Sequence, residues 1–159
     1  MKISRKYFIR RDLALYSEIE FAKFIMKRGF MPFYPFKDEG IDILAFNEKE
    51  NKIEFCQLKA RNEMKRYPNI YWFPIRKKDI EKLSRFPNAF FILCALRPDG
   101  KFDFFKLPVP VVKKYIELRE QTTKKQSKQF LEIERLGKRN YQIKPKRISE
   151  KIDINKYLL

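Results

Sequence analysis

The 159 residues suffice for one hydrophobic core and hardly for two domains, and 44 % apolar with 16 % aromatic residues exclude a disordered chain. The chain has 37 Lys and Arg against 20 Asp and Glu, a net charge of +17. Because so much positive charge repels itself, it indicates a polyanionic partner, and a lysine-rich proteome is the alternative explanation. Nucleic acid is favoured over a membrane, because no apolar run approaches the roughly 18 residues of a membrane span and the first residues lack a signal peptide's apolar core; we expect a cytoplasmic protein.

Hydrophobic periodicity and turn residues predict an α/β chain that opens with a helix. Asp12 can cap this helix, which ends near Gly29. Its expected buried stripe consists of Leu15, Ile19, Ala22, Ile25 and Met26. Apolar runs then predict strands, and a second helix precedes a central strand that is covered on both faces. These elements are strands 30–35, 41–46, 53–60 and 70–74, a helix over 77–86, and strands 89–96 and 101–107.

From about residue 111 the chain becomes strongly basic. Residues 111–151 hold 13 Lys and Arg against 5 Asp and Glu. The pattern predicts a helix to about residue 119 and another over 129–136. The polar stretch between them fits a solvated surface and a phosphate-contacting arm equally well. We therefore predict a core over 1–110 and a basic, partly helical C-terminal extension over 111–159 that packs on the same domain.

Two residue types limit the chemistry. Cys56 and Cys94 are too few for a disulfide framework and have no partners at metal-ligand spacing, so we expect buried, reduced thiols. The chain has no histidine, which removes the usual general base and the usual zinc ligand. Any catalysis must use carboxylates, lysines and a hard cation, and no organic cofactor is indicated.

Asp42 is out of place in an apolar strand. Alternation along residues 41–46 puts it on one face with Leu44, while Ile41 and Ile43 lie on the other. Aspartate is depleted in strands, and a carboxylate removed from water is costly unless it is paired or binds a metal. A metal ligand is therefore the favoured interpretation, and an Asp that accepts backbone N–H groups at a turn is the alternative.

Gln57 and Lys59 repeat this anomaly on the next strand. They lie two residues apart and share a face, and a short hairpin loop brings their strand beside that of Asp42. Oxygens of Asp42, of the Gln57 amide and of the Leu58 backbone carbonyl suit a hard divalent cation. Lys59 can polarise a water or neutralise a scissile phosphate, although a lysine that merely reaches solvent is the alternative. The trio predicts a phosphodiesterase site.

These residues resemble the motif of the PD-(D/E)XK nuclease superfamily, in which an acid on a helix precedes an Asp on a hairpin and an acid-x-Lys sequence on the next strand. Here the pieces are Glu18, with Glu20 as the alternative, then Gly40-Ile41-Asp42 and Gln57-Leu58-Lys59. The resemblance covers about residues 17–61, and the later elements fit the family's αβββαβ core. Gln57 stands where an acid is usual, and Ile41 where Pro is usual.

The resemblance implies a restriction-endonuclease-like α/β fold on a mixed sheet and a Mg²⁺-dependent DNA endonuclease, with Mn²⁺ as a substitute. Similarity to Holliday-junction resolvases and to homing and restriction endonucleases implies a homodimer. The implied catalytic set is Glu18, Asp42, Gln57 and Lys59, with one or two cations on Asp42, Gln57, the Leu58 carbonyl and, in a fuller set, Glu18. The alternative is a non-catalytic nucleic-acid-binding module, because Gln57 lacks the usual charge. An RNA endonuclease of the tRNA-splicing type would need a histidine.

Basic residues near this site are the expected phosphate contacts. They follow the second motif strand or lie in the polar part of the basic segment: Arg61, Lys65, Arg66, Lys124, Lys125 and Lys128. Tyr71 and Trp72 alternate on the next strand, where core or dimer-interface packing is favoured over base stacking. Residues 71–73 and 157–159 are the expected interface pieces.

Overall fold

The protein is described by a computed structural model over residues 10–36, 40–122, 128–137, 140–143 and 153–159. Helices are interspersed with runs of strands along the chain, as expected for the α/β class. The elements are α1 (Arg10–Met26), β1 (Phe30–Phe33), β2 (Ile43–Asn47), β3 (Lys52–Asn62), β4 (Ile70–Arg76), α2 (Lys77–Leu83), β5 (Ala89–Leu96), β6 (Phe102–Pro108), α3 (Val109–Thr122), β7 (Lys128–Arg135), β8 (Tyr141–Ile143) and the 3₁₀ helix η2 (Ile154–Tyr157).

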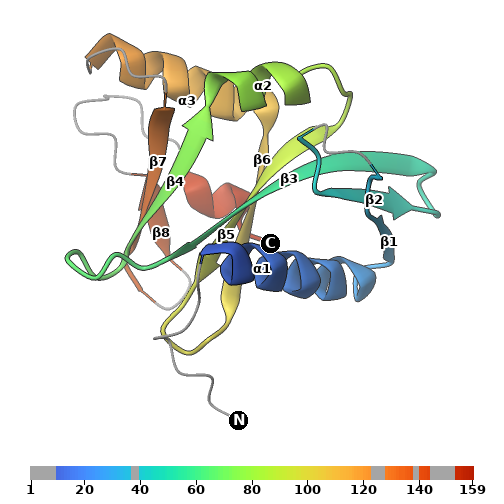
Figure 1. Cartoon of the computed structure of the whole chain (residues 1–159), viewed down its shortest axis with the longest axis horizontal. Coiled ribbons are helices and arrows are strands. Elements are labelled where there is room, and N and C mark those ends of the chain that lie inside the picture. The colour runs from blue at the N-terminus through green and yellow to red at the C-terminus, as the bar shows by residue number, and fades with distance from the viewer. Residues whose placement is uncertain (1–9, 37–39, 123–127, 138–139, 144–152) are drawn as a thin grey trace.

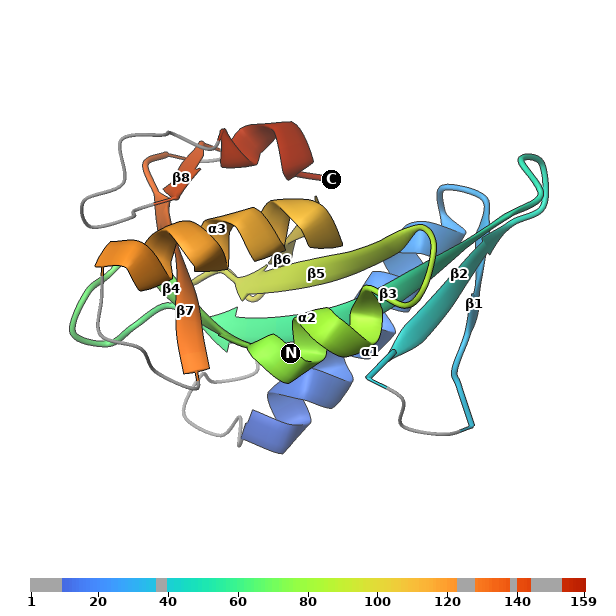
Figure 2. The same ribbon diagram turned by 90° about the horizontal axis from the view of Figure 1, so that it is seen from above.

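The central sheet has five strands in the order β1-β2-β3-β5-β6. It is mixed, because β3 and β5 run parallel whereas the other neighbours are antiparallel. Helix α1 lies on one side of this sheet, and α2 and α3 lie on the other (Figures 1 and 2). The predicted mixed-sheet α/β fold is confirmed, because α1, β1, β2, β3, α2 and β5 follow the order αβββαβ. Strand β4 lies between β3 and α2 in the chain and belongs to a second sheet.

Strand β5 is buried on both faces, as its continuous apolar run predicts. Phe91 and Leu93 pack in the core cluster under α2 and α3, whereas Ile92 and Cys94 pack in the cluster against α1. Cys94 and Cys56 are free and buried, in agreement with the prediction. Burial raises the pKa of the Cys56 thiol to about 12, so this sulfur is an inert core group.

A second sheet, in the order β4-β7-β8, uses the segment that the sequence predicts to be a helix. The predicted helix over 129–136 is wrong, because residues Lys128–Arg135 form β7 and pair antiparallel with β4. Tyr71 and Phe73 face Ile133 and Leu131 in this pairing and are fully buried. Among its described residues, the extension is α-helical in α3, forms the strands β7 and β8, and includes the 3₁₀ helix η2.

The buried face of α1 also differs from the expected one. Leu15, Ile19 and Met26 are exposed, at 59, 41 and 59 %, and are not part of the core. Ala22 and Ile25 are buried as predicted, and the rest of the buried stripe consists of Leu13, Ser17 and Phe21. Apolar residues occupy several sides of this helix, so periodicity alone does not select a face. The aromatic ring of Phe21 packs 5.3 Å from that of Phe104 on the sheet face that α1 covers, and this contact fixes which side of the helix is buried.

Candidate active site

Asp42 lies at the point where the chain enters β2 beside β3. Its backbone N–H donates to the carbonyl oxygen of Cys56 at 2.9 Å, and its carboxylate Oδ2 accepts from the backbone N–H of Leu58 at 2.6 Å. Because the β2–β3 register ends at Ile43 and Cys56, this carboxylate takes the place of the next main-chain partner along β3. It lies on the side of β3 just beyond its pairing with β2, which we call the edge of the site. This position is compatible both with an acceptor of a backbone N–H and with a metal ligand.

The prediction that Asp42 continues the strand alternation is wrong. Strict alternation would put Ile41 and Ile43 on one face. Ile41 instead packs in the cluster under α2 and α3, whereas Ile43 packs in the cluster against α1. Strand β2 begins only at Ile43, so the backbone at Asp42 does not follow strand geometry and its carboxylate meets the main chain of β3.

The carbonyl of Leu58 belongs to the same edge. In an extended strand the N–H and the C=O of one residue point to the same side, because paired residues exchange both hydrogen bonds. The N–H of Leu58 points to Asp42, so its carbonyl oxygen faces the same edge. The structure thus brings the Asp42 carboxylate and the Leu58 main chain together, as the motif implies.

Glu18 interacts with this edge from helix α1. Burial raises the pKa of its carboxyl above the ordinary value, and the negative charge of Asp42 raises it further. The two carboxylates therefore lie close enough to repel each other. Glu20, the alternative helical acid, forms an exposed ion pair on the helix surface, with Oε1 2.8 Å from Nζ of Lys23.

Gln57 is a buried polar residue with an unused acceptor. Its side chain is 5 % exposed, and within the described part of the chain its Oε1 has no hydrogen-bond partner. Such an atom costs free energy unless a donor or a cation satisfies it. Gly40 lies against this amide: a Cβ on Gly40, where φ is +82°, would be 3.7 Å from Nε2 of Gln57. A cation bound by Oε1 would satisfy the orphan atom.

Lys59 is held by a carboxylate rather than reaching freely into solvent. Its Nζ lies 3.1 Å from Oδ2 of Asp79, a residue of the first turn of α2 whose side chain is 4 % exposed. Arg76 binds the same carboxylate through Nε at 3.0 Å and Nη2 at 2.8 Å. Burial alone would raise the pKa of Asp79, but the Arg76 hydrogen bond and the Lys59 charge outweigh it and keep the pKa below the ordinary value.

Sequence reasoning missed Asp79. An Asp in the first turn of a helix is ordinarily a solvated residue that favours the helix dipole, so its position alone gives no functional signal. It follows Lys59 by 20 residues, and only the course of the chain through β4 into α2 brings the two together. Its ionised carboxylate restrains the Lys59 ammonium at the face of the sheet that also carries Gln57.

Three of the predicted phosphate contacts have side chains that the structure describes, and they lie on β3 or in the segment that follows it. Nη1 of Arg61 donates to the carbonyl of Ala60 at 2.6 Å, and this half-buried side chain follows the strand. Lys65 and Arg66 are exposed in the segment between β3 and β4, far from the β2–β3 turn (Figure 1). Two further predicted contacts, Lys124 and Lys125, lie outside the described residues, as does the side chain of Lys128 at the start of β7.

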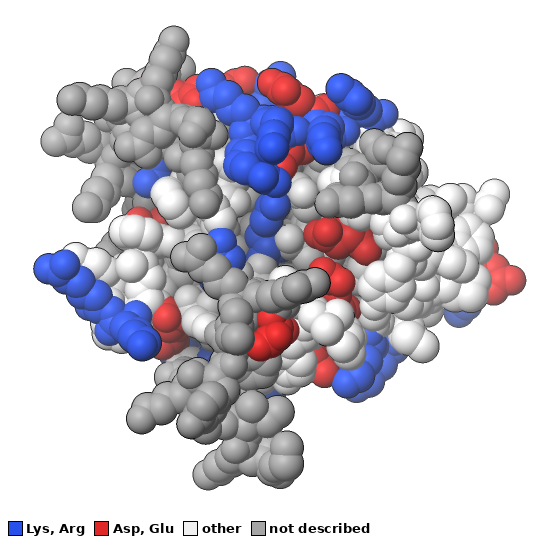
Figure 3. Space-filling view, in the orientation of Figure 1, with Lys and Arg blue, Asp and Glu red and all other residues white. Residues whose placement is uncertain are grey.

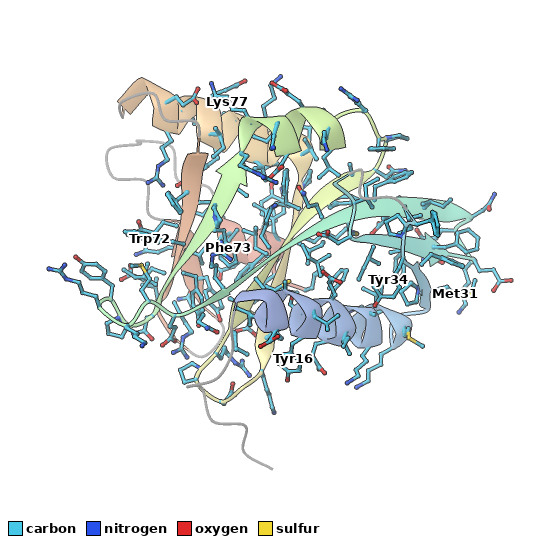
Figure 4. The ribbon with its side chains drawn as sticks, in the orientation of Figure 1. Tyr16, Met31, Tyr34, Trp72, Phe73 and Lys77 are labelled. Atoms are coloured by element: carbon cyan, nitrogen blue, oxygen red, sulfur yellow. The ribbon has the colours of Figure 1, made fainter. Side chains whose placement is uncertain are left out.

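The aromatic pair on β4 is split between core and surface. Tyr71 is fully buried, in agreement with core packing, and Trp72 is 36 % exposed with its ring 5.9 Å from that of Phe130. Trp72 and Phe73 lie on opposite sides of the strand (Figure 4). Residues 71–73 are therefore mainly core, and Leu158 and Leu159 pair with β6 of the same chain. Trp72 is partly exposed and Leu158 and Leu159 are only half-buried, so a role of residues 71–73 and 157–159 in a dimer interface stays a prediction.

The oxygen donors at the edge fit a hard divalent cation. They are the carboxylates of Glu18 and Asp42, the amide oxygen of Gln57 and the backbone carbonyl of Leu58. Among the described residues no three His, Cys, Asp or Glu side chains gather as a metal cluster, so any cation here depends on amide and carbonyl oxygens as well. That donor set suits Mg²⁺ or Mn²⁺ better than zinc.

Comparisons with known proteins give likeness in structure alone. Neither protein-family models nor curated protein sequences match this chain. The bacterial homing endonuclease I-Ssp6803I is similar with a TM-score of 0.57 and 14 % identity, over 96 % of this chain and 88 % of that one. Hjc, a Holliday junction resolvase of the archaeal hyperthermophile Archaeoglobus fulgidus, has a TM-score of 0.49 and 17 % identity, over 76 and 82 %. The chain therefore shares the fold of this homing endonuclease, in agreement with the nuclease fold that the motif implies.

No helix among the described residues is both long and apolar enough to cross a membrane.

The strained acid pair predicts that Glu18→Gln stabilises the metal-free protein at neutral pH. Because the pKa of Glu18 is raised in the folded state, the stability that this group contributes is present at low pH and is lost as the pH rises through the folded value. Thermal unfolding in EDTA should show a higher midpoint for Glu18→Gln at neutral pH and a vanishing difference below about pH 4. Glu20→Gln, which removes only a surface pair, is the matched control and should not stabilise.

Proposed function

We propose that this chain is a metal-dependent DNA endonuclease that hydrolyses phosphodiester bonds. The observation that carries the proposal is the Asp42 carboxylate on the Leu58 main chain, beside a Gln57 oxygen without a partner among the described residues. Lys59 on the same strand supplies a positively charged side chain for phosphate chemistry. The fold shared with a homing endonuclease and the net charge of +17 support the same activity and a DNA partner.

The residues would divide the chemistry between binding and charge. Asp42, the Leu58 carbonyl, Gln57 and Glu18 would hold Mg²⁺, or Mn²⁺ in its place. When bound, the cation supplies Lewis-acid stabilisation of the phosphorane-like transition state and a more acidic water. Lys59, restrained by Asp79, would neutralise charge on the scissile phosphate. Glu18 and Asp42 repel each other, so these two carboxylates would be stabilised by a bound cation.

Gln57 supports a second candidate function. A neutral amide in the usual acidic position removes one negative charge and weakens cation binding, which also disfavours two simultaneous cations. A chain with this fold and this substitution could bind nucleic acid without cutting it. The retained Asp42 and Lys59 favour the enzyme.

Cleavage of three substrates side by side tests the proposal. Supercoiled plasmid, linear duplex and a four-way junction are each incubated with the protein in Mg²⁺, in Mn²⁺ and in EDTA. We expect metal-dependent products from at least one substrate, and the preferred one distinguishes restriction or homing from junction resolution. If the protein binds all three and cuts none with either metal, the non-catalytic function is supported instead.

We also propose a homodimer, because cutting both strands of a duplex needs two sites related by symmetry. The exposed residues Leu15, Ile19 and Met26 recur at helical spacing on α1 and form the candidate interface. Sedimentation at micromolar concentration should show a dimer, and Ile19→Lys should shift it toward monomer while Leu136→Lys, at another exposed apolar residue, should not. A monomer throughout, with and without DNA, contradicts the proposal.

A further inference from the structure

Helix α2 presents a row of cations on its outer face. Lys78 and Lys82 are four residues apart and Arg85 follows three later, so the three side chains lie on one side of the helical path. The turn continues through Arg85, whose backbone N–H donates to the carbonyl of Lys82 at 3.3 Å. All three residues are exposed, whereas the opposite face of α2 is buried through Ile80 and Leu83. We call Lys78, Lys82 and Arg85 the α2 cation row.

The charges of this row are available to a partner. The neighbouring basic side chains are held in ion pairs: Nζ of Lys77 lies 2.9 Å from Oε1 of Glu120, and Arg76 pairs with Asp79. Within the described part of the chain no ion pair is found for any member of the row. Glu81 lies beside the row and is exposed, which leaves the face with a net positive charge. Lys and Arg side chains gather over α2 in the surface view (Figure 3).

The row adjoins the candidate active site through two contacts. Asp79, next to Lys78 in the helix, carries the Lys59 ammonium at 3.1 Å. The stem of Lys82 lies over Gly40, since a Cβ there would be 3.5 Å from Cδ of Lys82 and 3.7 Å from Nε2 of Gln57. A DNA strand whose phosphates contact the α2 cation row would therefore lie next to Gln57 and Lys59.

We propose that the α2 cation row binds consecutive phosphates of the DNA strand that enters the active site. This inference rests on the proposed function and names a phosphate-binding surface that the sequence motifs do not predict. The row spans seven residues of helical path, roughly 10 Å at about 1.5 Å per residue. Three cations over that length are close enough together to contact adjacent phosphates of one strand. Lysine and arginine ammonium and guanidinium groups are the side chains that make such contacts.

The test is the salt dependence of binding to a duplex of arbitrary sequence, followed by fluorescence anisotropy in EDTA. The variant Lys78→Ala/Lys82→Ala/Arg85→Ala removes three charges while adding a strong helix former, so α2 should remain folded. We expect weaker binding and a log–log slope less steep by about 2.7, since each lost phosphate contact removes about 0.9. The matched control, Lys27→Ala/Lys49→Ala/Lys101→Ala, removes the same charge from exposed residues of other segments and should change the slope much less.

A second variant tests the surface in the opposite direction. Glu81→Gln removes the acid beside the row and should tighten binding, whereas Glu50→Gln in the β2–β3 turn should not. Equal losses in the row variant and its control, together with no gain for Glu81→Gln, would overturn the inference while leaving the nuclease proposal intact. A slope near zero for the unaltered protein would instead remove DNA binding altogether, and with it both proposals.

Discussion

Asp42→Asn should abolish cleavage and leave DNA binding level or tighter. The amide keeps an acceptor oxygen for the Leu58 N–H, so the sheet edge should persist. It removes the negative charge that would hold the proposed cation, and it also relieves repulsion between the site and phosphate. Single-turnover cleavage and anisotropy measured on the same preparation separate these effects. Asp99→Asn, in the exposed β5–β6 turn, is the control and should cut as well as the unaltered protein. Normal cleavage by Asp42→Asn would show that the assigned site is wrong.

Two companion variants complete this test. Lys59→Ala should slow cleavage by about 100-fold or more, the scale for the loss of one electrostatic stabiliser. Lys49→Ala, in the β2–β3 turn, should not. Gln57→Glu restores the commoner acidic ligand and should retain activity or change the metal preference. If Gln57→Glu cuts where the unaltered protein does not, the chain is a binding module with a degenerate site.

Asp79→Asn should slow cleavage by about 10- to 100-fold without weakening DNA binding. This is the range for losing a partner that orients an active-site group rather than the group itself. The Lys59 ammonium would lose its charged partner, and Arg76 would lose the same carboxylate. Because the variant has one more positive charge, the DNA dissociation constant should stay level or fall. A change confined to kcat is therefore expected.

Two controls separate positioning by Asp79 from its structural role. Asp79→Glu keeps the charge and should recover part of the lost rate. Arg76→Gln removes the other partner but leaves the Lys59–Asp79 contact, so its rate should fall less. Thermal unfolding of each variant shows how much of the change is stability. Cleavage by Asp79→Asn at the rate of the unaltered protein would exclude a positioning role.

The motif and the central sheet were predictable because local rules and tertiary contacts agree there. The hairpin that carries Asp42 and Gln57 has short-range pairing, and the apolar run at residues 89–96 has one plausible position, buried on both faces. Segment β7 was not predictable in the same way. Gln, Leu, Glu and Arg are good helix formers, and only the pairing with β4 overrides that preference.

The candidate site shows the same division between local and long-range information. Residue identity predicted Asp42 as an anomaly, yet its orientation depends on where β2 begins, which alternation does not reveal. The resemblance favours Glu18 over Glu20, and the tertiary position of α1 separates them: Glu18 is partly buried and repelled by Asp42, whereas Glu20 pairs with Lys23 on the helix surface. Asp79 and the α2 cation row depend entirely on how the chain crosses from β3 through β4 to α2.

The pairing of β4 with β7 has a consequence for the order of folding. Residues 70–76 lead directly into α2 and Asp79, but their only strand partner among the described residues is formed by residues 128–135. Contacts of such sequence separation close slowly and late. During synthesis, the motif strands can pair as soon as β5 emerges, whereas the support for Asp79 must wait for β7. A ribosome-bound chain that ends before residue 128 should therefore bring the proposed ligands Asp42 and Gln57 together before Lys59 is fixed, so the proposed nuclease would stay inactive until β7 has paired.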